Sequence, residues 1–321
     1  MTIASSSPLV ESSDQLAVVL LGPTGSGKTA LSLALGERFQ GEIVSCDSVA
    51  VYRGLDLGSA KPTPAEQARL PHHLIDVADP DEPFTAGDYS RLGRAALRAI
   101  AARGRLPIVT GGTGLYLRAL TDGLFDGPSR DADLRARLQQ SAERHGNGWL
   151  HRILARLDPA TAARIHSNDT PKLIRAIEVC VAARRPMSEV LAAPDTKNDP
   201  LTGFHLLRIG LNPSRAALYE RLNSRCAAMF ASGLVEETRA LLARYGPVTA
   251  LDSLGYRQAR AVVEGTLPLD EAIAQAQQGH RNYAKRQLTW FRREPDVHWI
   301  EDFGDSASTI ETATGLARAQ L

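Results

Sequence analysis

The sequence predicts an α/β fold in which a parallel sheet is flanked by helices and a helical insertion interrupts the sheet domain. Short apolar runs alternate with stretches that carry apolar residues at helical spacing. This alternation is typical of parallel sheets that are covered by helices on both faces. After about Phe125 the strand signals stop, and the chain becomes helical and charged until a last apolar run at 204–211.

The expected elements follow in order from these runs. The first strand is LAVVLL at 16–21, which leads through a glycine-rich turn into the helical stretch TALSLALGERF. EIVSCD at 42–47 is a second strand candidate. The helical stretch DYSRLGRAALRAIAARG precedes a third, RLPIVTGG at 105–112. The last is FHLLRIGL at 204–211, and helices are expected after it through residue 293.

The length also favours more than one domain. A chain of 321 residues, 43% of them hydrophobic, can bury a full core and exceeds the usual size of a single domain. We expect a core domain at 16–125 that resumes at 201–300 after a mostly helical insertion at 126–200. Residues 1–15 are expected to form a disordered leader, and 301–321, small and polar, a frayed tail.

Charge and cysteine content narrow the class of protein. The net charge of +1 gives no whole-molecule attraction to nucleic acid or membrane, so such attraction needs a local cluster. Cys46, Cys180 and Cys226 form no CxxC pair, which argues against a zinc site or a disulfide framework. The apolar run at 16–21 is far too short to cross a membrane. We expect a cytoplasmic monomer with no membrane partner.

Residues 22–29, GPTGSGKT, match the phosphate-loop pattern G-x-x-x-x-G-K-[ST] between a predicted strand and a predicted helix. In such a loop, backbone N–H groups surround phosphate oxygens and Lys28 supplies a positive charge. The Thr29 hydroxyl is placed to ligate a magnesium ion, Mg²⁺, that bridges the phosphates. The alternative is a glycine-rich turn with a surface lysine. The predicted fold is therefore P-loop NTPase-like, and the expected phosphate-binding residues are Gly22, Pro23, Thr24, Gly25, Ser26, Gly27, Lys28 and Thr29.

The acid that an NTP hydrolase needs is missing. Such enzymes hold the metal with a carboxylate at the end of another apolar strand, but LPIVT runs into GGTGLY without an acid. Asp47 lies 19 residues (47 minus 28) beyond Lys28 at the end of EIVSC, where parallel strands carry their binding crevice. Asp47 is either a cap of the next segment or a base that takes a proton from an acceptor. These two features alone favour a small-molecule kinase.

Eight ordered stretches, running from residue 22 to 292, resemble the tRNA dimethylallyltransferase family, also called tRNA isopentenyltransferases. The resemblance implies transfer of a dimethylallyl group from dimethylallyl diphosphate to N6 of the adenosine just 3′ of the anticodon in tRNA. The phosphate loop would then hold the diphosphate leaving group of a prenyl donor. The stretches are GPTGSGKT, CDSVAVYRGLDLGSAKP, PHHLIDVADPDEPFTAGDY, IVTGGTGLYLRAL, IHSNDTPKLIRAIEV, GLVEE, SLGYRQ and YAKRQLTWFR.

The chemistry fits this assignment. A leaving diphosphate gathers negative charge as its carbon–oxygen bond breaks, and N–H groups, Lys28 and a Thr29-bound magnesium ion stabilise that charge. The adenine amine is a weak nucleophile that must lose a proton, which suits a base at Asp47. No water needs to be activated, so the missing hydrolytic acid is not required.

The resemblance also implies roles for Thr113, in GGTGLY, and Arg135, in DADLRARL, beside the reacting centre and the tRNA. Thr113 could instead cap a turn, and Arg135 could lie on a solvated helix face. Of the residues named so far, Asp47, Thr113 and Lys28 are expected to act in catalysis.

Arg221 and Arg225 are four residues apart and share one face of a predicted helix, where they could bind diphosphate oxygens. Arg225 completes the expected catalytic set. Family members often carry an aspartate two residues after the second arginine, whereas this chain has Ala227. A surface ion pair, for instance with Glu220, is the alternative for these arginines.

A basic cluster lies at 279–293, GHRNYAKRQLTWFRR, which contains no acid. On a helix, Arg281, Lys285 and Arg292 form a phosphate-facing stripe. A packing stripe of Tyr283, Gln287 and Trp290 lies beside it. Trp290 and Phe291 could simply anchor the core. Together with the segments implied by the resemblance, the expected tRNA contacts are Asp47, Ser48, Val49, Ala50, Thr113, Arg135, Pro171, Lys172, Leu173, Ile174, Arg175, Asp252, Ser253, Leu254, Gly255, Tyr256, Arg257, Arg281, Lys285, Arg286, Gln287, Trp290 and Arg292.

Two further expectations complete the analysis. Delivering N6 to the donor requires the target base to leave its stack and enter a pocket. His72 and His73 have no cysteine or carboxylate pair at ligand spacing, so a structural role is expected for both. The rival hypotheses are a phosphate-loop kinase and a nucleotide-dependent RNA-binding module without chemistry.

Overall fold

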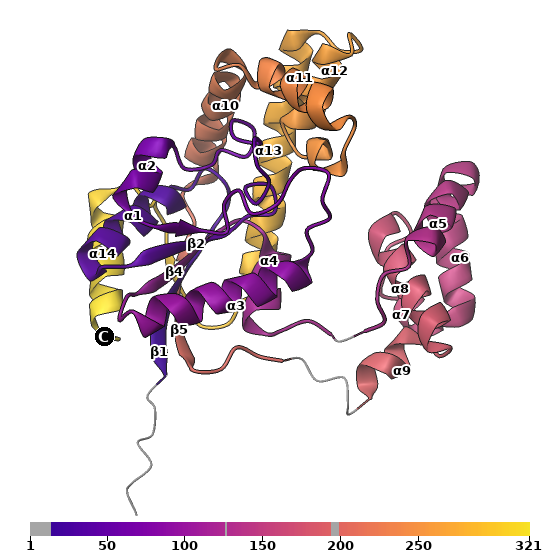
Figure 1. Ribbon diagram of the computed structural model, residues 1–321, viewed down its shortest axis with the longest axis horizontal. Helices are drawn as coiled ribbons and strands as arrows, with labels where there is room; N and C mark the ends of the chain where they lie inside the picture. Colours follow the sequence, from indigo (N-terminus) through magenta and orange to yellow (C-terminus); the bar gives the residue numbers. More distant parts are fainter. Residues whose placement is uncertain (1–13, 126, 194–198) are drawn as a thin grey trace, which may run out of the picture. The chain divides into compact units, whose positions relative to one another are not determined.

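The computed structural model describes residues 14–125, 127–193 and 199–321, which form two compact units (Figure 1). The helical unit is Asp122–Pro200, and the sheet unit takes the chain up to Thr121 and from Leu201 onward. Residues 1–13 of the expected leader lie outside the described residues. Gln15, also assigned to the leader, already pairs with Phe204 in the first strand, so the leader boundary was placed too late.

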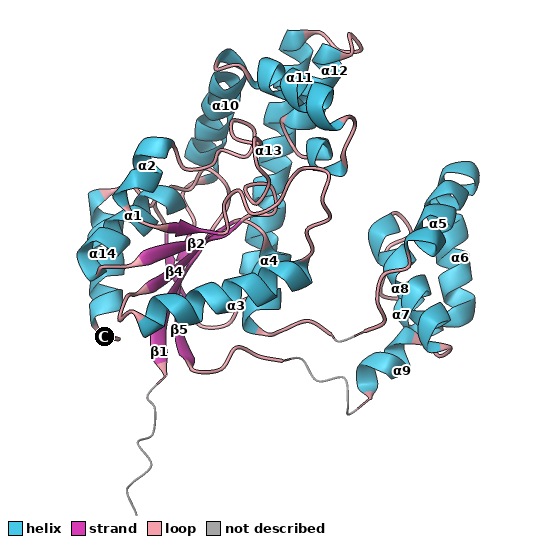
Figure 2. Cartoon of the chain, in the orientation of Figure 1, coloured by secondary structure: helices cyan, strands magenta, loops and turns pink. Residues whose placement is uncertain are grey.

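The sheet unit is built on a six-stranded sheet in which every pair of neighbours is parallel (Figure 2). The strand order is β3-β2-β4-β1-β5-β6. The predicted α/β fold with a P-loop NTPase-like parallel sheet is therefore confirmed. The strands are β1 (Gln15–Leu21), β2 (Glu42–Cys46), β3 (His72–His73), β4 (Pro107–Gly111), β5 (Phe204–Leu211) and β6 (Val297–Ile300).

Helices cover both faces of the sheet, which explains why β1 reads as a continuous apolar run. Val18 and Leu20 pack with α1 (Lys28–Phe39) and α14 (Ala307–Arg318) on one face. Val19 and Leu21 pack on the other face with α3 and α4. These two helices are α3 (Ala86–Ala102), which begins with a Thr85–Asp88 capping box, and α4 (Gly114–Thr121).

A second core lies among the helices that follow β5. It is centred on fully buried residues such as Leu251 and Tyr256, and it also holds Leu55 from the segment after β2. The longest of these helices ends at Phe291, which is buried in the sheet core. The helices are α10 (Arg215–Ala231), α11 (Leu234–Tyr245), η1 (Thr249–Asp252), α12 (Tyr256–Val263) and α13 (Leu269–Phe291), while the short α2 (Pro64–Arg69) precedes β3.

The helical unit has its own core, formed by residues such as Leu150, Leu154 and Leu173. Glu178 is fully buried within the unit and accepts hydrogen bonds from Arg135 and Arg175. The helices are α5 (Ala132–His145), α6 (Asn147–Leu157), α7 (Pro159–Ala162), α8 (Thr170–Ala183) and α9 (Met187–Ala192).

The structure corrects the sequence analysis at the C-terminus. The expected frayed tail at 301–321 was wrong, because Ser306 caps α14 and Ala313 and Ala317 are fully buried against the sheet. Small residues allow that close packing without the bulky apolar pattern that signals a core helix. Strands β3 and β6 were also not predicted. Within the described residues, no helix has the length and apolar character needed to span a bilayer.

Candidate active site

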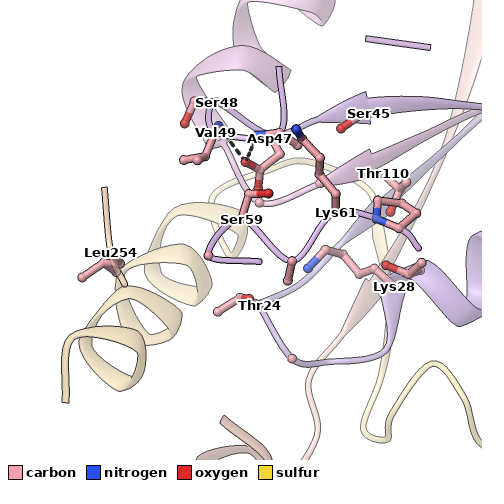
Figure 3. A pocket seen from close by; sticks show the side chains of 18 of the residues that line it. Thr24, Lys28, Ser45, Asp47, Ser48, Val49, Ser59, Lys61, Thr110 and Leu254 are labelled. Atoms are coloured by element: carbon pink, nitrogen blue, oxygen red, sulfur yellow. Dashed lines mark hydrogen bonds between the residues drawn. The ribbon is translucent and has the colours of Figure 1, made fainter. Parts of the chain in front are cut away.

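A cavity of about 670 Å³ opens where the parallel strands end (Figure 3). The phosphate loop after β1 lines it, together with Asp47 after β2 and Gly112 after β4. Arg225 of α10 and several residues of α13 complete the wall. The carboxyl end of a parallel sheet is the usual ligand site of open α/β folds, so this cavity is the candidate active site.

The phosphate loop turns sharply into α1. Gly27 has a φ of 92°, and a Cβ on it would lie 2.7 Å from the backbone nitrogen of Gly304, so glycine is required there. The N–H groups of Thr24 and Ser26 donate to Gln287 Oε1 (2.8 Å) and the Pro23 carbonyl (3.2 Å). The N–H groups of Gly25 and Gly27 make no hydrogen bond with the described residues, so they and the first turn of α1 are left to bind an anion.

Two cations at the loop have no carboxylate partner among the described residues. Lys28 Nζ donates only to the carbonyls of Gly22 and Pro23, at 2.9 and 2.8 Å. Arg225 Nη1 lies 3.5 Å from Thr24 Oγ1. Burial, assisted by Arg225, lowers the pKa of Lys28 to about 7, and burial also lowers the pKa of Arg225. Buried cations without a counter-ion are costly, so this site is built for an anion.

Arg221 also lines the cavity, but it is already paired. Its guanidinium donates to both oxygens of Asp305, at 2.9 and 2.5 Å, and lies 4.7 Å from the centre of the Phe303 ring. An ion pair was the alternative for this arginine, although Glu220 was the partner named. The Gly304 N–H donates to the Ser26 carbonyl at 2.8 Å. The segment after β6 is thus attached to the phosphate loop.

Asp47 lies in the same cavity as Lys28, and the ends of both side chains point into it (Figure 3). Asp47 Oδ1 accepts hydrogen bonds from the N–H groups of Val49 (2.8 Å) and Ala50 (3.2 Å). The capping role considered for Asp47 is therefore present. Its other oxygen, Oδ2, makes no hydrogen bond with the described residues, so it is available to accept a proton.

Thr113 supports the Asp47 segment from behind the cavity wall. Its hydroxyl accepts from the Ser48 N–H at 3.0 Å and donates to Ser48 Oγ at 3.2 Å. Its own N–H donates to the Cys46 carbonyl at 3.1 Å. The cavity wall does not include Thr113, and its hydroxyl is bonded to Ser48 rather than capping a turn. Thr113 thus holds the Asp47 segment in place, and its expected catalytic role stays a prediction.

Two histidines in the wall were not predicted as site residues. His72 Nδ1 bonds the Leu70 carbonyl at 2.8 Å. The Nε2 atoms of His72 and His280 are buried and have no hydrogen-bond partner in the part of the chain that the structure describes. Burial lowers the pKa of His72, and burial with Arg225 lowers that of His280 to about 4, so both are neutral at pH 7. His73 has the expected structural role, since its Nε2 lies 2.7 Å from Glu42 Oε2. No local pattern signals His280.

The basic stripe on α13 is only partly free. Lys285, Arg286 and Arg292 are exposed, whereas Arg281 donates to Asn223 and Gln278. Opposite them, Gln287 is buried. The predicted packing stripe is therefore present, and Phe291 anchors the core as considered, with Trp290 packed against it.

Several expected tRNA contacts have no exposed side chain. Ala50, Leu173, Ile174 and Tyr256 are buried, and the Tyr256 hydroxyl hydrogen-bonds Glu237 inside the second core. Ala50 nevertheless lines the cavity, and the expected tRNA contacts at these four positions stay predictions.

Arg135 and Arg175 are tied to one buried acid rather than lying free on a solvated face. Their guanidinium groups approach Glu178 at 2.7 and 2.6 Å. Burial opposes ionisation of Glu178, but hydrogen bonds from both arginines overcome it and lower its pKa to about 2. Pro171 and Lys172 lie on the exposed first turn of the same helix, α8.

From the segment 252–257, four residues lie at the cavity or beside it. Asp252, Ser253, Leu254 and Arg257 line the wall, and Gly255 supplies a positive φ of 88° where α12 begins. This segment therefore remains a candidate for substrate contact.

Comparison with known proteins identifies the family. A model described as IPP transferase matches residues 50–294, which is more than half of the chain. The chain is 62% identical to a tRNA dimethylallyltransferase of Koribacter versatilis, covering 95% of this chain and 99% of that one. It is 53% identical to a tRNA dimethylallyltransferase of Solibacter usitatus, covering 92% of this chain and 96% of that one.

A solved structure supports the same family. The tRNA isopentenylpyrophosphate transferase of Bacillus halodurans matches with a TM-score of 0.70 and 35% identity, covering 95% of this chain and 96% of that one. These matches support a prenyltransferase over a kinase. The chain therefore belongs to the IPP transferase family and is a prenyltransferase of the tRNA dimethylallyltransferase type.

Proposed function

We propose that the cavity binds dimethylallyl diphosphate with its diphosphate at the phosphate loop, and that N6 of an anticodon-loop adenosine in tRNA attacks its allylic carbon. One observation carries this proposal. Among the described residues, Lys28 and Arg225 have no carboxylate partner, and they share a cavity with a carboxylate oxygen of Asp47 that accepts no hydrogen bond. The cations suit a leaving anion, and the free oxygen suits a nucleophile that must lose a proton.

The step balances with these groups alone. The N6 lone pair forms a bond to the allylic carbon, and the bond from that carbon to the diphosphate oxygen breaks with its electron pair leaving on the diphosphate. The proton of N6 passes to Asp47 Oδ2. Lys28, Arg225 and the first N–H groups of α1 stabilise the negative charge that develops on the departing diphosphate.

A divalent cation fits the site, and we propose Mg²⁺. The Thr29 hydroxyl lines the cavity on the first turn of α1 and makes no hydrogen bond with the described residues. The described residues contain no cluster of three acidic, histidine or cysteine ligands, so the remaining ligands would be diphosphate oxygens and water, as is usual for Mg²⁺. When bound, the ion would neutralise charge on the diphosphate.

The cavity volume of about 670 Å³ lies within the range of small-molecule sites, roughly 300–1,000 Å³. A base must leave its stack to enter such a cavity. The exposed cations Lys285, Arg286 and Arg292 of α13 would hold the tRNA backbone while it does so.

We also propose that the protein acts in the cytoplasm as a monomer. All three cysteines are buried and free, which suits a reducing compartment. Light scattering of the purified protein with and without tRNA would test the monomer.

The test of function is a transfer assay with unmodified tRNA, labelled dimethylallyl diphosphate and Mg²⁺, run in parallel with labelled ATP. Prenyl label in the tRNA that disappears when the target adenosine is replaced supports the proposal. Phosphate label transferred from ATP would support the kinase, and retention of either label without turnover would support a binding module.

A further inference from the structure

Gln287 joins two parts of the active site that are far apart in sequence. It lies on α13, and its side chain is buried at 4% exposure. Its Oε1 accepts the N–H of Thr24 in the phosphate loop at 2.8 Å. Its Nε2 donates to the carbonyl of Gly112 at the end of β4, also at 2.8 Å. One amide thus bridges the loop and the neighbouring strand end.

The polarity of both partners is fixed because both are backbone groups. The Thr24 N–H can only donate and the Gly112 carbonyl can only accept, so the bridge needs one acceptor and one donor. The side-chain amide of Gln287 provides both, with its oxygen as the acceptor and its nitrogen as the donor. Gly112 also makes room for it, since a Cβ there would lie 2.1 Å from Gln287 Nε2.

The strand end that Gln287 holds is itself attached to the Asp47 segment. A Cβ on Gly111 would lie 2.1 Å from the Cys46 carbonyl, so β4 and the end of β2 are in close contact. Thr113 then bonds the Cys46 carbonyl through its N–H and the Ser48 N–H through its hydroxyl. Hydrogen bonds therefore run from the phosphate loop through Gln287 to the residues on either side of Asp47.

We propose that Gln287 is a positioning residue that fixes the spacing between the phosphate loop and Asp47. The proposal rests on the function given above, in which the loop holds the allylic donor and Asp47 accepts the proton of its attacker. Reaction requires the nucleophile and carbon to lie in near-attack geometry, and a misplacement of about 1 Å can reduce the rate about 100-fold. Gln287 thus acts on kcat, whereas a residue in contact with tRNA acts on affinity.

The first variant is Gln287→Met, which keeps the length of the side chain and removes both hydrogen bonds. We expect kcat to fall about 10- to 100-fold while the Kd for tRNA changes less than about twofold. The matched control is Gln275→Met, the same change at an exposed position of the same helix, which should leave both quantities unchanged. Retention of wild-type kcat by Gln287→Met, or a rise in Kd larger than the loss of kcat, would overturn the proposal.

The second variant, Gln287→Glu, separates positioning from general damage to the fold. An ionised glutamate still accepts from Thr24 but presents an oxygen to the Gly112 carbonyl, whereas a protonated one regains the donor. The kcat of this variant relative to wild type should therefore rise as the pH falls from about 8 to about 6. A ratio that stays flat, like the ratio expected for Gln287→Met, would contradict the role of the Gly112 bond.

The other titratable groups of the cavity are the same in the wild type and in Gln287→Glu. The ratio of the two kcat values therefore largely removes their effect on the pH dependence. Tyr283 and Arg286 on α13, Lys28 on α1, Arg225 on α10 and Asp47 after β2 line the same cavity. The Asp47→Asn variant separates the positioning role of Gln287 from the proposed role of Asp47 as the base. If it is inactive while Gln287→Met is fully active, only the positioning role fails. If Asp47→Asn is active, the proposed role of Asp47 as the base fails.

Discussion

Replacing Asp47 with asparagine tests the proposed base with little change to the fold. Asp47 Oδ1 accepts from the N–H groups of Val49 and Ala50 at 2.8 and 3.2 Å, and an asparagine oxygen can keep both bonds. What asparagine removes is the oxygen Oδ2 as a proton acceptor. Alanine would also remove the cap, which by comparison with helix caps costs about 1 kcal/mol of stability.

The expected loss is large. A positioned general base contributes about 10²- to 10⁴-fold in rate, which corresponds to roughly 3 to 5 kcal/mol of transition-state stabilisation. Single-turnover transfer of labelled dimethylallyl to saturating tRNA should show this loss for Asp47→Asn, with tRNA Kd and melting temperature close to wild type. Asp47→Ala should add a lower melting temperature to the same kinetic defect.

The alternative role of Asp47 as a cap alone makes the opposite prediction. If the carboxylate only holds the segment 47–50, asparagine should preserve turnover within about threefold and alanine should not. Equal losses of turnover and tRNA affinity in Asp47→Asn would also refute the base, because a proton acceptor acts at the reacting centre.

Three further predictions follow from the electrostatics. The pKa of Lys28 is about 7, and a bound diphosphate favours its ammonium form. Calorimetry should therefore show an affinity for dimethylallyl diphosphate that is full below pH 7 and falls above it, by up to about tenfold per pH unit. Lys28→Arg should flatten this decline, and a pH-independent affinity of the native protein would contradict the prediction. Glu178→Gln should lower the free energy of unfolding by roughly 2 kcal/mol in urea titrations at pH 7, less than for a fully buried pair because Arg135 and Arg175 are partly exposed. The pKa of Glu178 is about 2 in the folded protein and 4.5 in the unfolded chain, so its contribution to the free energy of unfolding is present above pH 4.5 and lost as the pH falls toward 2. An equal effect of Glu178→Gln at pH 7 and at pH 2 would be evidence against this ion pair. Lys285→Ala should weaken tRNA binding and reduce the slope of log Kd against log salt by about one, with an unchanged slope excluding a phosphate contact.

The sheet was predictable where strands carry their own signal. The continuous apolar run of β1 reflects burial on both faces, and 204–211 matches β5 at both ends. Strand β3 has only two residues, His72 and His73, which pair with Ile43 and Val44 through backbone groups. Two residues are too few to show the apolar pattern from which a strand is predicted. The helix α14 was missed because its fully buried apolar residues are small, Ala313 and Ala317, with Ile310 and Leu316 only partly buried beside them.

The site was predictable where chemistry lies in a local motif. The phosphate loop and Asp47 are recognisable from spacing alone, and the structure brings both into one cavity. The Gln287 bridge joins residues that are 263 and 175 positions apart, so no local pattern encodes it. The pairing of Arg135 and Arg175 with a shared buried acid depends in the same way on helix packing within the helical unit.

The most direct test of the account is to follow the oxygen that joins carbon to phosphorus in dimethylallyl diphosphate. With this bridging oxygen labelled by a heavy isotope, mass spectrometry of a single turnover on tRNA reports which bond breaks. Attack on carbon at the phosphate loop predicts that all of the label leaves with the diphosphate and that prenylated tRNA carries none. Label released on dimethylallyl alcohol or dimethylallyl monophosphate, with phosphate joined to the tRNA, would mean cleavage at phosphorus and would contradict the account.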